Sequence, residues 1–281
     1  MGNSPVYALK KYGLKSFLRN AFSIVISDAA VVSFQKSGRT WLRLMFAKIL
    51  ADYYKVGEVR LDTEYMTFGK RLPNVLFSHA GCTLNHNKLN FRRMFRRKKL
   101  VLLVRDPRAT MVSLYHDHTK RNFWYSGGNQ SDFIRDKNWG LTKVLAFLND
   151  WAAEIKRRKG RKVLVMKYED LYLDTAGELK RFLNFLNFKY TDAMIADAVQ
   201  YGSVDNMRKM ELANTLKDYR MRPGSVADKQ SYRTRKCKLG SFREELCKVD
   251  LDYIDSELAG KLNPMFGYNY QWREFQYGTT F

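Results

Sequence analysis

The segment VVSFQKSGRTWLRLMFAKIL, residues 31–50, decides the fold. It opens with an apolar, largely β-branched run that predicts a buried strand. A polar turn, residues 35–40, follows, and apolar residues then recur at helical spacing. In a strand–turn–helix unit of this kind, turn amides and the helix N-terminus face an anion, and Lys36 adds a further donor. The segment therefore predicts a phosphate-binding loop, with a plain tight turn at Gly38 as the alternative.

The order of residues in this loop separates it from the common ATP-binding loop. A Walker A loop has the order G-x-x-x-x-G-K-[ST], with the lysine after the glycines. Here Lys36 precedes Gly38, the only glycine of the turn. We therefore expect an anion other than the triphosphate of an ordinary NTPase.

A second apolar run, LVLLV at residues 100–104, also predicts a buried strand. Asp106 and Pro107 suit the N-cap and first position of a helix. Arg105 then falls at the carboxyl end of the strand, where open α/β sheets bind ligands, and Ser113 lies about two turns into the helix. A guanidinium there suits a phosphate, although an ion pair with a neighbouring carboxylate is the alternative.

The third informative segment is the basic stretch YRTRKCKLG, residues 232–240. On its own such a run is typical of a solvated surface. Together the three segments resemble the sulfotransferase family that uses 3′-phosphoadenosine 5′-phosphosulfate (PAPS), from about residue 28 to about residue 250. In that family a KSGTTW-like loop holds the 5′-phosphosulfate, an Arg and a Ser eight residues later hold the 3′-phosphate, and a late RKG segment closes over it. The residues that the resemblance implies for these contacts are Lys36, Ser37, Gly38, Arg39, Thr40, Trp41, Arg105, Ser113, Arg235 and Lys236.

The resemblance also implies roles near the reacting atoms. His79, which follows a short strand expected at residues 74–78, matches the family's catalytic base, and a neutral imidazole suits proton abstraction near neutral pH. Lys36 would stabilise the leaving oxygen, and Ser113 would steer Lys36. Tyr168 would contact the adenine, and Ser203 would touch the nucleotide. A purely structural histidine at a strand end is the alternative for His79.

Four positions depart from the family pattern. Arg39 replaces the first Thr of the loop, Phe77 replaces a Lys near the catalytic His, and Val204 replaces a Phe. Cys237 replaces the Gly of the RKG segment, and a residue with a β-carbon tolerates positive φ badly. The hydrogen bonding of the late basic segment is therefore open.

Length and composition fit one enzyme domain. The chain has 281 residues, of which 45% are hydrophobic, and no Pro/Gly/Ser-rich linker or repeat divides it. We expect a single α/β domain over residues 1–281, with a parallel sheet flanked by helices and a P-loop-kinase-like core. An N-terminal extension should cover about residues 1–27, and a C-terminal nucleotide lid about residues 216–240.

The net charge of +22 bears on partners. Basic clusters at residues 92–99 and 156–162 are by default solvated loops, with nucleic acid as the second possibility. No nucleic-acid-binding motif accompanies them, so we expect no specific nucleic-acid partner. An anionic acceptor, such as a glycan or a lipid headgroup, would also be attracted. Golgi members of the family carry an N-terminal anchor, and we find no run of about 20 apolar residues here. The resemblance therefore implies a cytoplasmic, bacterial enzyme, which could lie peripherally at the inner membrane face. Three scattered cysteines indicate reduced thiols and no metal site.

The acceptor pocket should come from the loop at residues 119–138, whose aromatic residues could stack on a sugar or an aryl ring. We favour a hydroxyl of a carbohydrate or glycoconjugate. Two other functions stay open: a small-molecule or nucleotide kinase on a related core, and a basic binding protein without catalysis.

Overall fold

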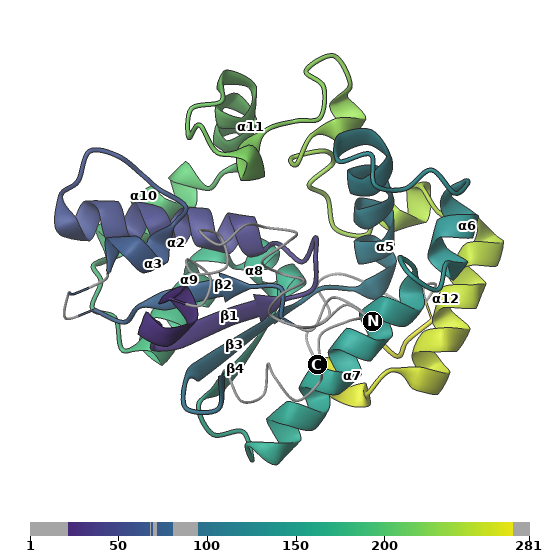
Figure 1. Ribbon diagram of the computed structural model, residues 1–281, viewed down its shortest axis with the longest axis horizontal. Coiled ribbons are helices and arrows are strands. Elements are labelled where there is room, and N and C mark those ends of the chain that lie inside the picture. Colours follow the sequence, from purple (N-terminus) through teal and green to yellow (C-terminus); the bar gives the residue numbers. More distant parts are fainter. Residues whose placement is uncertain (1–21, 68, 70–71, 81–94, 272–281) are drawn as a thin grey trace.

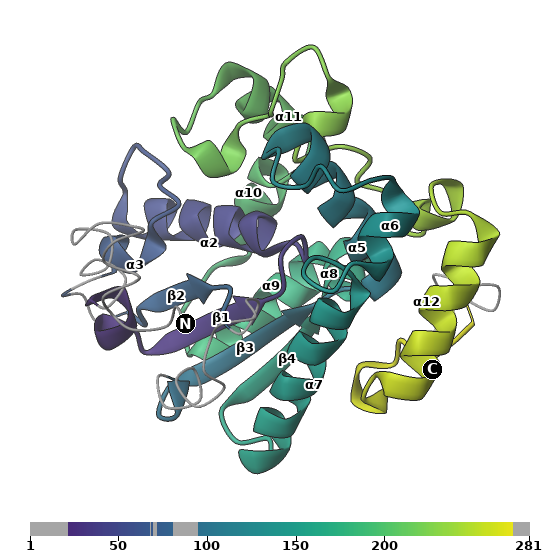
Figure 2. The ribbon, with the colours of Figure 1, turned by 45° about the vertical axis from the view of Figure 1, so that its right-hand side comes forward.

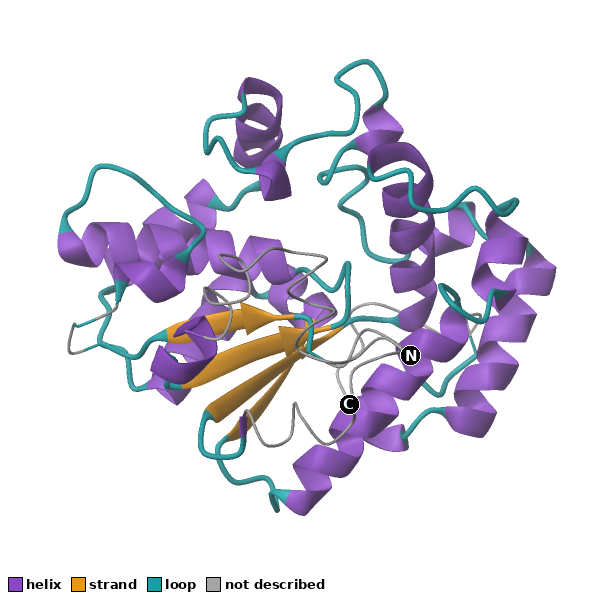
Figure 3. Cartoon of the chain, in the orientation of Figure 1, coloured by secondary structure: helices purple, strands orange, loops and turns teal. Residues whose placement is uncertain are grey.

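The computed structural model describes residues 22–67, 69, 72–80 and 95–271. Its centre is a parallel sheet, shown in orange in Figure 3, with the order β2-β1-β3-β4. The strands are β1 (Ala29–Ser33), β2 (Val75–Ser78), β3 (Lys99–Val104) and β4 (Val163–Lys167). Val31 of β1 is in register with Phe77 of β2 and Val101 of β3. The strands expected from the two apolar runs are confirmed, and so is the α/β class.

Helices cover both faces of the sheet (Figure 1). The helices are α2 (Arg39–Tyr54), α3 (Thr63–Met66), α5 (Pro107–His116), α6 (Gln130–Arg135), α7 (Leu141–Arg157), α8 (Tyr168–Leu173), α9 (Thr175–Leu186), α10 (Asp192–Tyr201), α11 (Val204–Ala213) and α12 (Lys248–Lys261). Short helical turns are η1 (Asp117–Arg121, π-helical), η2 (Tyr219–Met221), η3 (Lys229–Ser231), η4 (Ser241–Glu244) and η5 (Pro264–Phe266).

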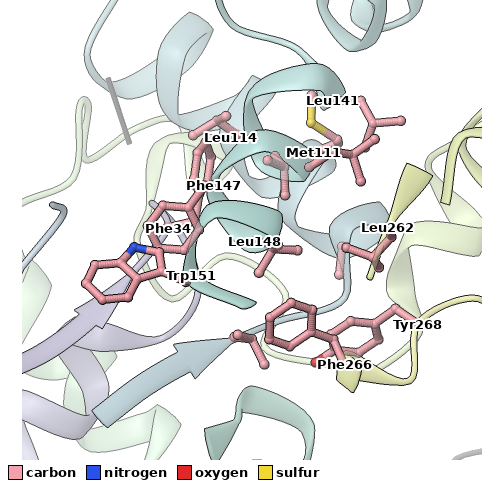
Figure 4. Packing of buried hydrophobic residues seen from close by; sticks show 14 of the residues in the cluster. Phe34, Met111, Leu114, Leu141, Phe147, Leu148, Trp151, Leu262, Phe266 and Tyr268 are labelled. Atoms are coloured by element: carbon pink, nitrogen blue, oxygen red, sulfur yellow. The ribbon is translucent and has the colours of Figure 1, made fainter. Parts of the chain in front are cut away.

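Alternate residues of the strands feed two hydrophobic cores, because successive side chains of a strand point to opposite faces. Val31 packs with residues of α2, α9 and α10 on one face. Val32 packs on the other face with α5, α7 and α12, where Phe34, Phe147 and Trp151 meet (Figure 4). Burial on both faces explains why the strands read as continuous apolar runs.

The turn after β3 is fixed as the sequence predicts. Asp106 caps α5 by accepting a hydrogen bond from the amide of Arg108 (2.8 Å), and Pro107 is the first helical residue. Arg108 is itself fully buried, and its Nε donates to Asp255 of α12 at 2.7 Å. Tyr270 donates to Asp106 at 2.6 Å. The end of the described chain is thereby tied to the carboxyl edge of the sheet.

The segment expected as a lid, residues 216–240, follows α11 and lies on the side of the molecule between α2 and α5 (Figures 1 and 2). Arg121 of η1 donates to the carbonyls of Tyr219 and Arg222, both at 2.8 Å. A Cβ on Gly224 would come within 2.6 Å of the backbone of Arg121, so the two segments touch closely.

Two sequence expectations fall partly or wholly on residues outside the described ranges: the N-terminal extension and the first basic cluster. Within the described ranges, no helix combines the length and the apolar character that crossing a membrane requires.

Candidate active site

The loop between β1 and α2 has the shape of an anion-binding turn. Its backbone is left-handed at Lys36 (φ 64°) and at Gly38 (φ 89°), which precedes the first residue of α2. A Cβ on Gly38 would lie 2.5 Å from the ring of Tyr168, so glycine is required both by φ and by space. The N-terminus of α2 therefore opens at the carboxyl edge of the sheet, where an anion gains from its amides.

Arg105 lies beside this loop, at the end of β3. Its Nη1 donates to the carbonyl of Lys36 at 2.9 Å, and its guanidinium stacks 4.3 Å from the ring centroid of Tyr168. Tyr168 in turn meets Trp41 edge-on, and the Trp41 indole donates to the carbonyl of Gly202 at 2.7 Å. The Nε of Arg105 is buried without a hydrogen-bond partner. A fixed, incompletely satisfied guanidinium is suited to an anionic ligand.

His79 follows β2, the strand next to β1. Its Nδ1 lies 3.0 Å from the carbonyl of Ser33. Because a carbonyl only accepts, Nδ1 carries the hydrogen and the lone pair resides on Nε2. Burial and the neighbouring charge of Arg39 lower the pKa of His79 well below its ordinary value. His79 is therefore a neutral imidazole with a basic nitrogen at neutral pH.

Lys36 forms an ion pair that the sequence did not indicate. Its Nζ lies 2.7 Å from Asp117 of η1, one helical turn beyond Ser113. Burial lowers the pKa of Lys36 to about 8, with Arg233 adding to the effect and Asp117 opposing it. Burial alone would raise the pKa of Asp117, but Lys36 outweighs it and holds that pKa below the usual range.

All these groups face one cavity of about 710 Å³ at the carboxyl edge. The predicted residues that line it are Lys36, Gly38, Arg39, Thr40, Trp41, His79, Arg105, Ser113, Tyr168 and Ser203. The hydroxyl of Ser203 also caps α11, where it accepts from the amide of Asn206. The structure thus brings together residues from most of the segments that the sequence singled out.

Three predicted residues stand outside the cavity lining. Ser37 is buried beneath the loop. Arg235 donates to Glu245 at 2.6 and 2.9 Å, and Lys236 pairs with Glu244 at 3.1 Å. Burial would raise the pKa of Glu245, but the hydrogen bonds of His116 and Arg235 lower it to about 2. To contact a nucleotide, Arg235 and Lys236 would have to leave these carboxylates.

Some lining residues were missed: Asp117 and Arg121 of η1, and Arg233 of the basic segment. Trp124, from the loop expected to form the acceptor pocket, and Cys237, from the expected lid, also line the cavity. Cys237 has φ 49°, the left-handed conformation that suits the glycine usual at this position. The sequence spacing does not distinguish Arg233 from the other basic residues of this segment. Which arginine faces the cavity depends on how η3 folds.

Among the described residues, no three His, Cys, Asp or Glu side chains gather as metal ligands would. Asp117 is the one carboxylate among the cavity-lining residues that the structure describes. Lys and Arg outnumber it there, and they are Lys36, Arg39, Arg43, Arg105, Arg121, Arg220 and Arg233. The described lining therefore carries an excess of positive charge, which favours an anionic ligand.

A parallel α/β domain with a phosphate-type loop at the carboxyl edge defines a nucleotide-binding enzyme domain. The family model described as a sulfotransferase domain matches residues 27–265. The chain belongs to the sulfotransferase family, as the sequence motifs predicted.

Individual proteins similar to this chain are also sulfotransferases. Sulfotransferase 2B1 of Homo sapiens is 24% identical over 237 residues, which cover 76% of this chain and 60% of that protein. The chain thus spans less than two thirds of that relative's length. The 3-alpha-hydroxysteroid sulfotransferase of Cavia porcellus is 22% identical over 263 residues, 87% of each chain.

Solved structures share the fold. Mouse sulfotransferase SULT7A1 complexed with PAP has a TM-score of 0.61 and 17% identity, covering 89% of both chains. Retinol dehydratase, in complex with androsterone and the inactive cofactor PAP, has a TM-score of 0.65 and 16% identity, covering 90% of this chain and 83% of that one.

Proposed function

We propose that this protein transfers a sulfuryl group from PAPS to an acceptor hydroxyl. The observation that carries the proposal is the convergence of Lys36, Arg105 and His79 on one cavity next to the loop that precedes α2. Two structural neighbours are complexes with PAP, 3′-phosphoadenosine 5′-phosphate, which is PAPS without its sulfuryl group. These complexes and the family membership support PAPS as the donor. When bound, the donor supplies an activated sulfuryl group, so the protein's task is positioning and charge stabilisation.

The residues fit that donor. Its phosphates need donors at a helix N-terminus and fixed cations, and the loop and Arg105 provide both. The buried, unpartnered Nε of Arg105 is a specific place for a phosphate oxygen. Tyr168 and Trp41 supply aromatic surface next to Arg105 for a base. Ser113 and Ser203 add hydroxyls to the same wall.

His79 is the proposed general base. Its Nε2 would take the proton of the acceptor hydroxyl, while Ser33 holds Nδ1 and so fixes the ring. Lys36 would leave Asp117 and place its ammonium at the oxygen on which negative charge develops. Asp117 thus keeps Lys36 charged and in place while the cavity is empty.

The kinase alternative has weak support. A kinase holds Mg²⁺ through carboxylates. The carboxylate that lines this cavity, Asp117, is held by Lys36 and Arg121. A sulfotransferase needs no such ligand, so the residues favour sulfuryl transfer.

We further propose a carbohydrate or glycoconjugate as acceptor. Trp124 lies in the cavity wall and is 58% exposed, so its ring face is accessible to a sugar. The net charge of +22 favours an anionic glycan or a surface of anionic headgroups as the setting of the acceptor. Location at a membrane face stays a prediction.

The test is transfer of ³⁵S from labelled PAPS to a set of carbohydrate acceptors, with wild-type protein and His79→Ala. Loss of a general base should lower turnover by about 10²–10⁴-fold with little change in PAP affinity. The matched control is His116→Ala, since His116 pairs with Glu245 and is not part of the cavity lining. Turnover of His79→Ala near that of wild type would move the base elsewhere, and no transfer to any acceptor despite PAP binding would favour a binding protein.

A further inference from the structure

The cavity holds one arginine that neither the fold nor the proposed donor contacts account for. Arg233 lines the cavity near Lys36 and His79, and the Nε of its guanidinium is buried. Burial and the charge of Arg121 lower the pKa of Arg233 to about 10. A desolvated cation beside other cations is costly unless an anion joins them.

Among the described residues, no hydrogen bond or ion pair joins this guanidinium to a carboxylate, although Asp117 and Glu211 lie near enough to oppose the lowering of its pKa. Its hydrogen bond is to the hydroxyl of Thr40, at 3.3 Å, and its Nε is buried with no partner. Glu211 is close, but its carboxylate accepts from the backbone amides of Arg233 and Thr234 and from the Thr234 hydroxyl. Glu211 therefore fixes the backbone of Arg233 and leaves the guanidinium directed at the cavity.

Other lining cations have protein partners. Lys36 pairs with Asp117, Arg220 pairs with Asp218 and Asp62, and Arg105 stacks on Tyr168. Arg121 lies 3.3 Å from the same Asp117 and is anchored by carbonyls of the lid segment. One carboxylate thus faces Lys36, Arg121 and Arg233 together, which leaves an excess of positive charge at this point.

The excess of positive charge extends from the donor loop, where Arg233 donates to Thr40, toward η1. Lys36, the α2 N-terminus and Arg105 already face the proposed phosphates. Arg121 belongs to η1, which leads directly into the loop with Asn122 and Trp124, where we expect the acceptor. Arg233 and Arg121 therefore lie where an acceptor beside His79 would place its substituents.

We infer that Arg233, with Arg121, binds an anionic group of the acceptor, a carboxylate or sulfate of an acidic sugar next to the hydroxyl that is modified. This inference rests on the proposed function and names the substrate class of that site. A guanidinium binds such groups through two parallel hydrogen bonds, which fixes the orientation of the ring as well as its affinity.

The experiment compares 4-nitrophenyl β-D-glucuronide with 4-nitrophenyl β-D-glucoside, which differ only at C6, a carboxylate in the first and a hydroxymethyl group in the second. Binding of each is measured by calorimetry to protein saturated with PAP. Wild-type protein should bind the glucuronide about 10-fold or more tightly, the size of one charge-assisted hydrogen bond. Arg233→Met should lose this preference and keep its PAP affinity, which also shows that the variant is folded.

Arg222→Met is the matched control, because Arg222 is an exposed lid arginine that contacts Asn214 and does not line the cavity. It removes the same charge and should keep the preference. Equal affinity for the two glycosides in wild-type protein, or a preference that survives Arg233→Met, would overturn the inference. A loss of PAP affinity in Arg233→Met would also overturn it, since Arg233 would then serve the donor. If wild-type protein fails to bind PAP, the proposed function fails instead.

Discussion

Arg105 joins three parts of the site: the loop through the carbonyl of Lys36, the aromatic wall through Tyr168, and the end of β3 through its own backbone. Its Nε has no hydrogen-bond partner and is therefore open to a ligand atom. A substitution of Arg105 can for this reason distinguish a structural role from a role in ligand binding. A structural arginine would affect folding, whereas a phosphate-binding arginine would affect nucleotide affinity.

We expect Arg105→Ala to weaken PAP binding by roughly 1.5–3 kcal/mol, the contribution of a charge-assisted hydrogen bond. Isothermal titration calorimetry measures the change directly. Arg161→Ala, which removes the same charge from an exposed turn, should bind PAP like wild type. An unchanged PAP affinity in Arg105→Ala would leave Arg105 with a structural role only.

The lowered pKa of Lys36 predicts a pH dependence. With a pKa of about 8, the ammonium loses its proton as pH rises through 8 in the empty protein, and an anion at the site favours the protonated form. PAP affinity should therefore fall between pH 7.5 and 9, and binding near pH 8 should take up protons. Titrations in buffers of different ionisation enthalpy measure that uptake. Lys36→Arg, which keeps its charge, should show neither effect; an equal fall in this variant would assign the titration to another group.

At the scale of elements, several arginines of the lid segment are held by partners within the protein. Arg220 and Arg235 have carboxylate partners, and Arg222 contacts Asn214. Arg220 and Arg233 both line the cavity, but Arg233 has no ion pair with a carboxylate among the described residues. Ordering of the segment by nucleotide stays a prediction, now resting on the contacts between the lid and η1.

Gly224 is the place to test that contact. A Cβ there would lie 2.5 Å from the carbonyl oxygen of Lys120, so Gly224→Ala should push the lid away from η1. We expect amides of residues 216–240 to gain hydrogen-exchange protection on adding PAP in wild type, and to gain less in Gly224→Ala. Gly260→Ala on α12 is the control, because nothing lies within 4 Å of its Cβ position. Unchanged protection in wild type at saturating PAP would contradict a lid.

The local sequence pattern was enough to predict the strands, the loop and the capped start of α5. Each depends on neighbours in sequence: β-branched runs, a glycine in a tight turn, an Asp-Pro pair. The Lys36–Asp117 pair and the inward position of Arg233 could not be predicted this way. Lys36 and Asp117 are 81 residues apart, and Arg233 is 193 residues from Thr40. Such contacts depend on how distant elements pack.

At the scale of the molecule, buried charges tie the last helix to the site. Arg108 of α5 lies between Asp106 and Asp255, and Tyr268 donates to Glu169 at 2.8 Å. Burial and the nearby Asp106 raise the pKa of Glu169. These contacts between the C-terminal part of the described chain and the residues that follow β3 and β4 therefore hold the carboxyl edge of the sheet in place.

Removing Arg108 should destabilise the whole fold. Arg108→Met removes the cation that pairs with two buried carboxylates, and loss of one member of a buried ion pair costs about 3–5 kcal/mol. Urea unfolding monitored by circular dichroism measures this loss. Arg181→Met, which breaks an exposed pair with Glu178, should cost about 0.5 kcal/mol or less. Similar losses in the two variants would show that the buried network contributes no more than a surface pair.

The measurement that tests the central claim most directly compares the stabilisation of the wild-type chain by PAP and by ATP with Mg²⁺. At 100 times its dissociation constant, a ligand that binds only the folded state adds about 2.7 kcal/mol to the free energy of unfolding. The account predicts that PAP raises the melting temperature at concentrations where ATP with Mg²⁺ has little effect, and that Arg105→Ala reduces the PAP shift. Equal shifts with the two nucleotides, or a shift with ATP and Mg²⁺ alone, would contradict it.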